Sequence, residues 1–225
     1  MPTGIMATEP ALQKLLQWFS PAYPVGAFSF SHGLEWAVEC GLVRDRIGLE
    51  TWLADVLRHG SGWSDAVLLS HAFAAAGDSA ALAEVMALAA ALPATAELHL
   101  ETTMQGDAFA RVTETVWPSL PLGLDEDPPY PVAVGVAAAR HGLPLPATLS
   151  AYLHAFVANL VSAGVRIVPL GQSDGQRALA ALVLVIEDVA ARAPRVALED
   201  LGTASVTLDW CSMRHEQQYT RLFRS

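Results

Sequence analysis

The spacing of apolar side chains along the chain predicts helices. Large apolar residues recur every three to four positions in most segments, which is the period of an amphipathic or buried helix. No segment shows sustained alternation with β-branched residues, the pattern typical of a strand. The periodicity predicts helices over residues 9–19, 31–41, 46–60, 64–76, 79–92, 96–116, 130–141, 147–168, 173–192 and 205–223.

Local signals support several of these boundaries. Thr95 stands two residues before Glu97, so it is expected to cap a helix whose first turn is acidic. Ser173 and Gln176 have the spacing of a capping box. Ser64 is expected to start a further helix, and glycine or proline follows most of the predicted helix ends. The sequence therefore predicts an all-α fold of about ten helices.

The segment 147–168 is expected to be the long central helix of this fold. Residues 141–165 contain no charged side chain, and a segment of this length could cross a bilayer. However, Pro144 and Pro146 interrupt its start, and several polar residues interrupt the rest. We therefore interpret the segment as a core helix buried on two sides, and expect no membrane span.

The clearest breaks in the helical pattern are too short to be flexible linkers. Residues 117–131 are rich in proline and acidic residues, and residues 193–202 form a second break. Apolar helices are expected on both sides of the first break. The organisation expected from the sequence is therefore a single helical domain over residues 1–225, in which 212–225 is a C-terminal tail.

Composition narrows the functional classes. Hydrophobic residues make up 52% of the 225 residues and charged residues 16%, which favours a large core or an apolar surface reserved for partners. A net charge of −10 argues against nucleic-acid binding, which needs clustered positive charge. Residues 1–10 show no secretory signal, so a cytoplasmic location is expected. Cys40 and Cys211 are expected to be reduced there, and a single disulfide is the alternative.

The chain lacks the motifs of several enzyme classes. A P-loop, a dinucleotide-binding glycine motif and paired Cys-x-x-Cys or His-Glu-x-x-His metal motifs are all missing. Ser29 or Ser31 could act with His32 as a nucleophile and base, but the strand–turn–helix elbow and an orienting acid are missing. We therefore expect a non-enzyme without a cofactor. His59, Asp65 and His71 share no helix face, and ordinary surface positions are expected for them.

Two pairs of residues have the spacing of metal ligands on one helix face. His32 and Glu35 are one turn apart, and Cys211 and His215 are four residues apart. Neither pair has an evident second pair on another helix. Interpreted from the residues, Cys211 is a small buried thiol beside a surface imidazole. A nickel-binding chaperone or enzyme that uses His32, Glu35 or His215 remains the alternative hypothesis.

The last twelve residues differ in character from the rest of the chain. Residues 214–225 contain three arginines, a histidine, a tyrosine, a leucine and a phenylalanine against one glutamate, on an otherwise acidic chain. Arginine and aromatic side chains are enriched at the centres of protein interfaces. Composition alone leaves two interpretations open: a docking element, or a last helix packed on its own domain.

The motifs at both ends of the chain resemble those of the urease accessory protein family UreF. Residues 20–36, SPAYPVGAFSFSHGLEW, are similar to the family's S-P-x-x-P-V-G-x-[FY]-S-[YF]-S-x-G-L-E segment. Residues 212–225, SMRHEQQYTRLFRS, are similar to its S-x-R-H-E-x-x-Y-S-R-L-F-R-S segment, with Thr220 in place of serine. Residues 169–172, PLGQ, match a third segment. The resemblance spans nearly the whole chain.

The resemblance implies a non-enzymatic, all-helical, cytoplasmic chaperone that forms a homodimer and serves urease maturation by nickel insertion. The partners it implies are the accessory protein UreD (also called UreH), the GTPase UreG and apo-urease. The tail then becomes the expected docking element. In it, we expect the apolar pair of Leu222 and Phe223 to anchor a helix that exposes an arginine stripe. The expected partner-binding residues are Arg214, His215, Glu216, Tyr219, Arg221, Leu222, Phe223, Arg224, Gly171 and Gln172.

Overall fold

The computed structural model describes residues 9–225, and within that range the all-α expectation is confirmed. The described residues contain no strand and form α-helices joined by short turns and three 3-10 segments. The expectation of no secretory signal falls mainly on residues 1–8, outside the described range. The helices are α1 (Glu9–Trp18), α2 (Leu34–Glu39), α3 (Arg46–His59), α4 (Ser61–Ala74), α5 (Ser79–Ala91), α6 (Ala96–Val116), α7 (Tyr130–Arg140), α8 (Leu145–Ile167), α9 (Gln172–Ala181), α10 (Val183–Arg192) and α11 (Val206–His215).

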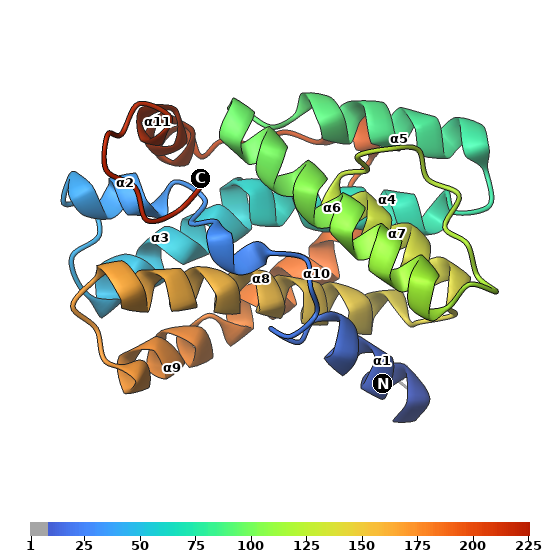
Figure 1. Cartoon of the computed structure of the whole chain (residues 1–225), viewed down its shortest axis with the longest axis horizontal. Coiled ribbons are helices and arrows are strands. Elements are labelled where there is room, and N and C mark those ends of the chain that lie inside the picture. The colour runs from blue at the N-terminus through green and yellow to red at the C-terminus, as the bar shows by residue number, and fades with distance from the viewer. Residues whose placement is uncertain (1–8) are drawn as a thin grey trace.

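Helices α4, α7 and α8 lie at the centre of the arrangement (Figure 1). Helix α4 packs most extensively against α7, and α6 covers the other side of α7. Helix α8 packs against α4, α9 and α10. Gly106 of α6 permits the close approach of the α7 start, because a Cβ there would overlap the carbonyl oxygen of Pro128. The buried side chains form one contiguous apolar cluster that draws on residues from Ala11 to Phe223.

Helix α8 is the long central helix expected from the sequence. It is the one described helix that is long and apolar enough to cross a membrane, and half of its most apolar window is buried in the structure. Leu149, Leu153 and Val157 are fully enclosed among the neighbouring helices. Packing in the core therefore accounts for the apolar character of this helix.

Two predicted helices differ in extent from those observed. The segment 173–192 forms two helices, α9 and α10, which are separated at Leu182. Leu182 is 2% exposed, so its burial in the core accompanies the break without any glycine or proline. The predicted helix 205–223 ends at His215, and residues beyond it follow an irregular path. The expected arginine stripe on a tail helix is therefore wrong.

Four predicted helix starts can be compared with the structure: one is confirmed, and three differ from the prediction. Thr95 caps α6 as predicted, because its hydroxyl accepts a hydrogen bond from the Leu98 N–H at 3.2 Å. Helix α4 begins at Ser61 instead of Ser64, and α9 has no side-chain cap, so the capping box is wrong. Helix α2 begins only at Leu34, because His32 (φ 58°) and Gly33 (φ 76°) are both left-handed.

Candidate functional site

The tail, residues 212–225, lies against the N-terminal motif. It leaves α11, passes beside α2 and ends near the segment that leads into α2 (Figure 1). The backbone N–H of Arg224 donates to the Ser29 carbonyl at 2.8 Å, and the Ser31 N–H donates to the Ser225 carbonyl at 2.9 Å. The two most distinctive segments of the sequence therefore form one structure. We call the residues that hold the tail, 29–36 and the first turns of α6, the tail seat.

Glu35 is the central anchor of the tail seat. Its carboxylate accepts hydrogen bonds from the N–H groups of Leu222, at 2.7 Å, and Phe223, at 2.9 Å. The same carboxylate lies 3.2 Å from Nε2 of His215. Glu35 is 9% exposed, and a carboxylate at such depth needs hydrogen-bond donors. The motif glutamate therefore fixes the tail backbone.

His215 is enclosed between two carboxylates. Its Nδ1 lies 2.6 Å from Glu97 of α6, opposite the Glu35 contact, and its side chain is fully buried. Each ring nitrogen therefore faces one carboxylate. Arg221 adds a second contact to Glu97. The expectation of a surface imidazole is therefore wrong, and His215 links α2, α6 and α11.

Glu216 supports the same junction from the end of α11. Its carboxylate accepts hydrogen bonds from the N–H of Ala96 at 2.9 Å and of Glu97 at 3.4 Å. These N–H groups lie in the first turn of α6, where the helix dipole favours negative charge. Glu216 therefore caps α6 from a distant part of the chain.

Ser225 closes the end of the seat. Its carbonyl accepts a second hydrogen bond, from the Ser31 hydroxyl, and its own hydroxyl donates to Glu101 at 2.7 Å. The His32 N–H lies 3.3 Å from the same hydroxyl oxygen. Ser31 is thus a buried structural residue that holds the tail.

Phe223 and Leu222 have opposite roles in the tail. Phe223 is 4% exposed and joins the apolar core, and the Arg166 guanidinium lies 4.4 Å from its ring centre. Leu222 is 62% exposed, and its backbone N–H bonds to Glu35. The expected apolar pair is therefore half correct, since Phe223 alone anchors the tail through its side chain.

The outward face of the tail carries basic and aromatic side chains. Tyr219 is fully exposed, and Leu222 and Arg224 project from the same segment. Arg214 is exposed and lies over the Trp36 ring at 5.2 Å. On α11, Trp210 and Met213 add about half of their side-chain surface. The outward face is defined as Trp210, Met213, Arg214, Tyr219, Leu222 and Arg224.

Gly171 and Gln172 do not lie with the tail. Both are exposed at the start of α9, which Figure 1 shows on the opposite side of α2 and α3 from α11. Within residues 9–225 no hydrogen bond or ion pair joins them to the tail. Their expected partner-binding role stays a prediction, and it concerns a separate surface.

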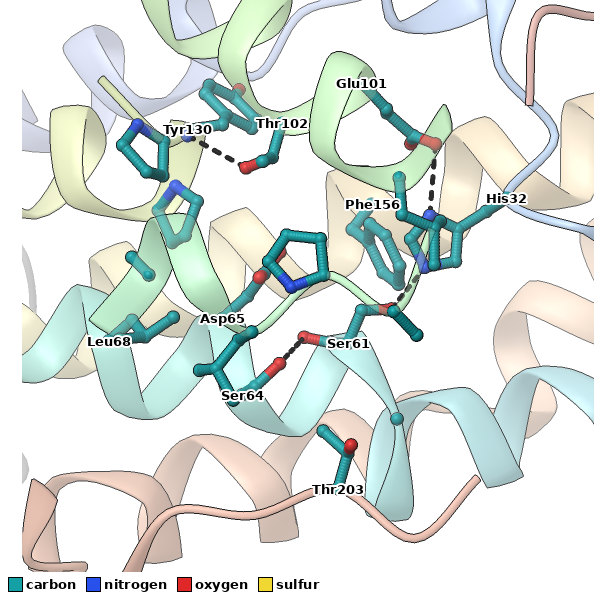
Figure 2. Close-up of a pocket in the computed structure, with 18 of the residues that line it drawn as sticks. His32, Ser61, Ser64, Asp65, Leu68, Glu101, Thr102, Tyr130, Phe156 and Thr203 are labelled. Carbon is teal, nitrogen blue, oxygen red and sulfur yellow. Dashed lines mark hydrogen bonds and ion pairs between the residues drawn. The ribbon is translucent and has the colours of Figure 1, made fainter. Parts of the chain in front are cut away.

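A pocket lined by both apolar and ionisable side chains lies directly beside the tail seat (Figure 2). Its lining includes His32 and Glu101, which also hold the tail, together with Asp65 of α4 and Asp209 of α11. Nδ1 of His32 lies 3.2 Å from Glu101, and Nε2 meets the Ser61 hydroxyl. The Tyr152 hydroxyl donates to Asp65 at 2.7 Å. The expected surface position of Asp65 is therefore wrong.

Burial dominates the protonation of the Asp65 carboxyl. Burial raises its pKa to about 6, and the Tyr152 hydrogen bond and the charge on His32 oppose that shift. For His32, burial lowers the pKa, but Glu101, by charge and hydrogen bond, and the charges of Asp65 and Asp209 outweigh it, so the pKa is raised. The protonation of His32 and that of the pocket carboxylates therefore depend on one another.

The arrangement of His32 differs from both chemical roles considered for it. It does not share a helix face with Glu35, because it pairs with Glu101 while Glu35 pairs with His215. Among the described residues, no group of three or more His, Cys, Asp and Glu side chains is placed to hold a metal ion. The side chains of Ser61, His32 and Glu101 form a chain of contacts from a hydroxyl through an imidazole to a carboxylate. In this chain the hydroxyl beside His32 belongs to Ser61, and not to Ser29 or Ser31, which the sequence offered as the nucleophile.

Sequence reasoning missed the α6 side of the site. Glu97 was recognised only as a first-turn acid, and Glu101 and Ser225 were not singled out. A four-residue spacing places Glu97 and Glu101 on one face of α6, and that face meets the tail. Spacing indicates a shared face but not its partner, because the partners lie more than 100 residues away.

The fold and the site together define an all-helical protein whose distinctive surface is a basic, aromatic segment held by a distant motif. The family model UreF matches residues 43–183. The chain is 52% identical over 222 residues to the urease accessory protein UreF of Rhodopseudomonas palustris (strain BisB5), covering 96% of this chain and 91% of that protein. It is also 52% identical over 216 residues to that of Agrobacterium fabrum (strain C58), covering 96% of each. The chain belongs to the UreF family.

Proposed function

We propose that this protein is a scaffold in urease maturation that binds the accessory protein UreD/UreH and recruits the GTPase UreG to apo-urease for nickel insertion. The observation that carries the proposal is the division of the tail into a held side and a free side. Glu35, His215 and Phe223 hold it from within, and the outward face remains open. A rigid presentation of arginine and aromatic groups lowers the entropy cost of binding a partner.

Charge supports the same division. The arginines of the tail belong to a chain whose net charge is −10, so they form a local basic surface on an otherwise acidic protein. Such a surface favours binding of a partner with a complementary acidic surface. Arg221 is partly neutralised by Glu97, whereas Arg214 makes a ring contact with Trp36 and retains its charge for a partner. Arg214 and Tyr219 are therefore the residues expected to contribute most to docking.

The proposed role is non-enzymatic and cytoplasmic. The curated relatives are named accessory proteins, which supports a helper function. The chain has no P-loop, so GTP hydrolysis belongs to a partner. The alternative of a nickel-binding chaperone through His32, Glu35 or His215 has no support in the geometry of the described residues. His32 pairs with Glu101, whereas His215 pairs with Glu35 and Glu97, and neither arrangement is placed to hold a metal ion.

One observation favours a second candidate function, a hydrolase. Ser61, His32 and Glu101 follow the order of a nucleophile, a base and an orienting acid beside a pocket. A fluorophosphonate probe separates the candidates, because it labels an activated serine. Labelling at Ser61 that is lost in Ser61→Ala supports the hydrolase, and an unlabelled protein supports the scaffold alone.

We also propose that the protein forms a homodimer. Large apolar side chains remain exposed away from the tail, including Leu12 and Leu16 of α1. Exposed apolar surface of this kind marks association sites in soluble proteins. Light scattering coupled to size exclusion tests this proposal, and a monomer at all concentrations contradicts it.

A pull-down of UreD/UreH and UreG with point variants tests the scaffold directly. Deleting residues 212–225 would also remove Phe223 from the core, so exposed side chains are the better targets. Tyr219→Ala and Arg214→Ala are expected to leave the melting temperature unchanged and to weaken capture by roughly 30-fold, the effect of losing about 2 kcal/mol at an interface centre.

The matched control is Leu184→Ala, which removes an exposed apolar side chain from α10, a helix packed on α3, α8 and α9. It is expected to bind both partners as the unaltered protein does. If the tail variants also retain full capture of both partners, the tail does not provide the docking surface and the proposal is wrong.

A further inference from the structure

The two cysteines of the chain meet where α2 packs against α11. The start of α2 lies close to α11, since a Cβ on Gly33 would meet the Ser212 nitrogen at 3.2 Å. Further along, the rings of Trp36 and Trp210 stand edge to face with centroids 6.4 Å apart. Cys40 follows directly as the C-cap of α2.

The two thiols differ sharply in accessibility. Cys211 is fully buried on α11, and both cysteines are free. Burial raises the pKa of the Cys211 thiol to about 12, and the charge of the Cys40 thiol and a hydrogen bond to it add to the shift. Cys40 is exposed to solvent. The pair therefore has one thiol that solvent can reach and one buried thiol at the same helix junction.

We propose that Cys40 and Cys211 are an oxidation site at which a small disulfide such as glutathione disulfide forms an intramolecular disulfide between α2 and α11. Cys40 loses its proton and its sulfur attacks one sulfur of the oxidant, which releases one glutathione thiolate. Cys211 then loses its proton and attacks the Cys40 sulfur, which releases the second. Two protein thiols are oxidised and one glutathione disulfide is reduced to two thiols.

The order of these steps follows from the two environments. The buried Cys211 remains a thiol and is unreachable by an external oxidant, so Cys40 reacts first. Cys211 reacts only with a sulfur already placed against it. The raised pKa leaves little Cys211 thiolate, but the attack is intramolecular, and its high effective concentration offsets that small fraction.

The disulfide would link the tail seat to the helix that leads into the tail. Helix α2 carries Glu35, which holds the tail backbone, and α11 leads directly into the tail. A covalent link between these helices restrains the motion that separates them. The inference concerns this joint only and does not depend on the identity of any partner.

Intact mass measurement after treatment with glutathione disulfide tests the proposal. The unaltered protein is expected to lose the mass of two hydrogen atoms, to lose both alkylatable thiols and to yield a linked Cys40–Cys211 peptide. Cys211→Ala is expected to retain one glutathione, and Cys40→Ala to remain unmodified. Circular dichroism confirms that both variants are folded.

Two results overturn the proposal. One is a stable glutathione adduct on Cys40 of the unaltered protein with Cys211 still alkylatable after unfolding. The other is a protein in which neither thiol reacts. Because the result for the unaltered protein decides the question by itself, a variant that fails to fold does not affect the test.

Discussion

Replacing Glu35 by alanine should release the tail while leaving the helices in place. The carboxylate accepts two tail N–H groups, at 2.7 and 2.9 Å, and contacts His215 at 3.2 Å. A hydrogen bond to a charged group contributes about 1.5–3 kcal/mol, and breaking a buried ion pair costs about 3–5 kcal/mol. We expect Glu35→Ala to cost about 3 kcal/mol of local tail stability, since water can reach part of the vacated site.

Native-state hydrogen exchange measures this release at the two affected amides. A cost of about 3 kcal/mol corresponds to roughly 100-fold faster exchange at the Leu222 and Phe223 N–H groups. Glu35→Gln keeps one acceptor oxygen and should give an intermediate increase. Glu39→Ala is the matched control, because Glu39 is an exposed glutamate on the same helix. The reasoning fails if both amides exchange no faster in Glu35→Ala than in this control.

Three further predictions concern the core and the pocket. Gly106→Ala should lower stability by about 2 kcal/mol or more in thermal unfolding, because its Cβ would overlap the Pro128 carbonyl, whereas Gly77→Ala, which has open space, should not. His215→Ala should cost about 3 kcal/mol in urea unfolding because it leaves two carboxylates facing a vacated site, and an unchanged midpoint would contradict that role. The folded-state pKa of Asp65, about 6, lies above its ordinary value of 3.8, so ionisation of this carboxyl destabilises the fold progressively from about pH 4 to pH 6. The free energy of unfolding of Asp65→Asn, relative to that of the unaltered protein, should therefore rise by up to roughly 3 kcal/mol between pH 4 and pH 7. A difference that does not change with pH would refute this.

Periodicity predicted the helices well because the central helices, such as α3 and α8, bury apolar side chains at helical spacing. It failed at Leu182, where the apolar pattern continues although the helix breaks. It failed again beyond His215, because Leu222 and Phe223 fit a helical pattern. There, the N–H groups of both residues bond to Glu35 instead of to the preceding turn. Tertiary contacts of this kind leave no local signal.

The tail was identified as a special segment from its composition, but the role of each residue was not. Aromatic and arginine content indicates interface chemistry without deciding which side faces inward. Phe223 and Leu222 are neighbours of similar hydrophobicity, yet one is enclosed and the other is open. The burial of His215 could not be predicted either, because the residues that pair with it, Glu35 and Glu97, lie in helices distant in sequence.

The bond between Glu35 and Leu222 spans 187 residues of sequence. Contacts of such separation form late, because the intervening chain must be ordered before the ends can meet. During synthesis, α2 is made early but has no tail to hold until α11 and the residues after it leave the ribosome. A chain that has misfolded or stalled anywhere between α2 and the tail cannot hold the tail in the tail seat, so it does not present the outward face in the conformation described here. Any partner that recognises this face therefore selects for molecules whose folding is finished.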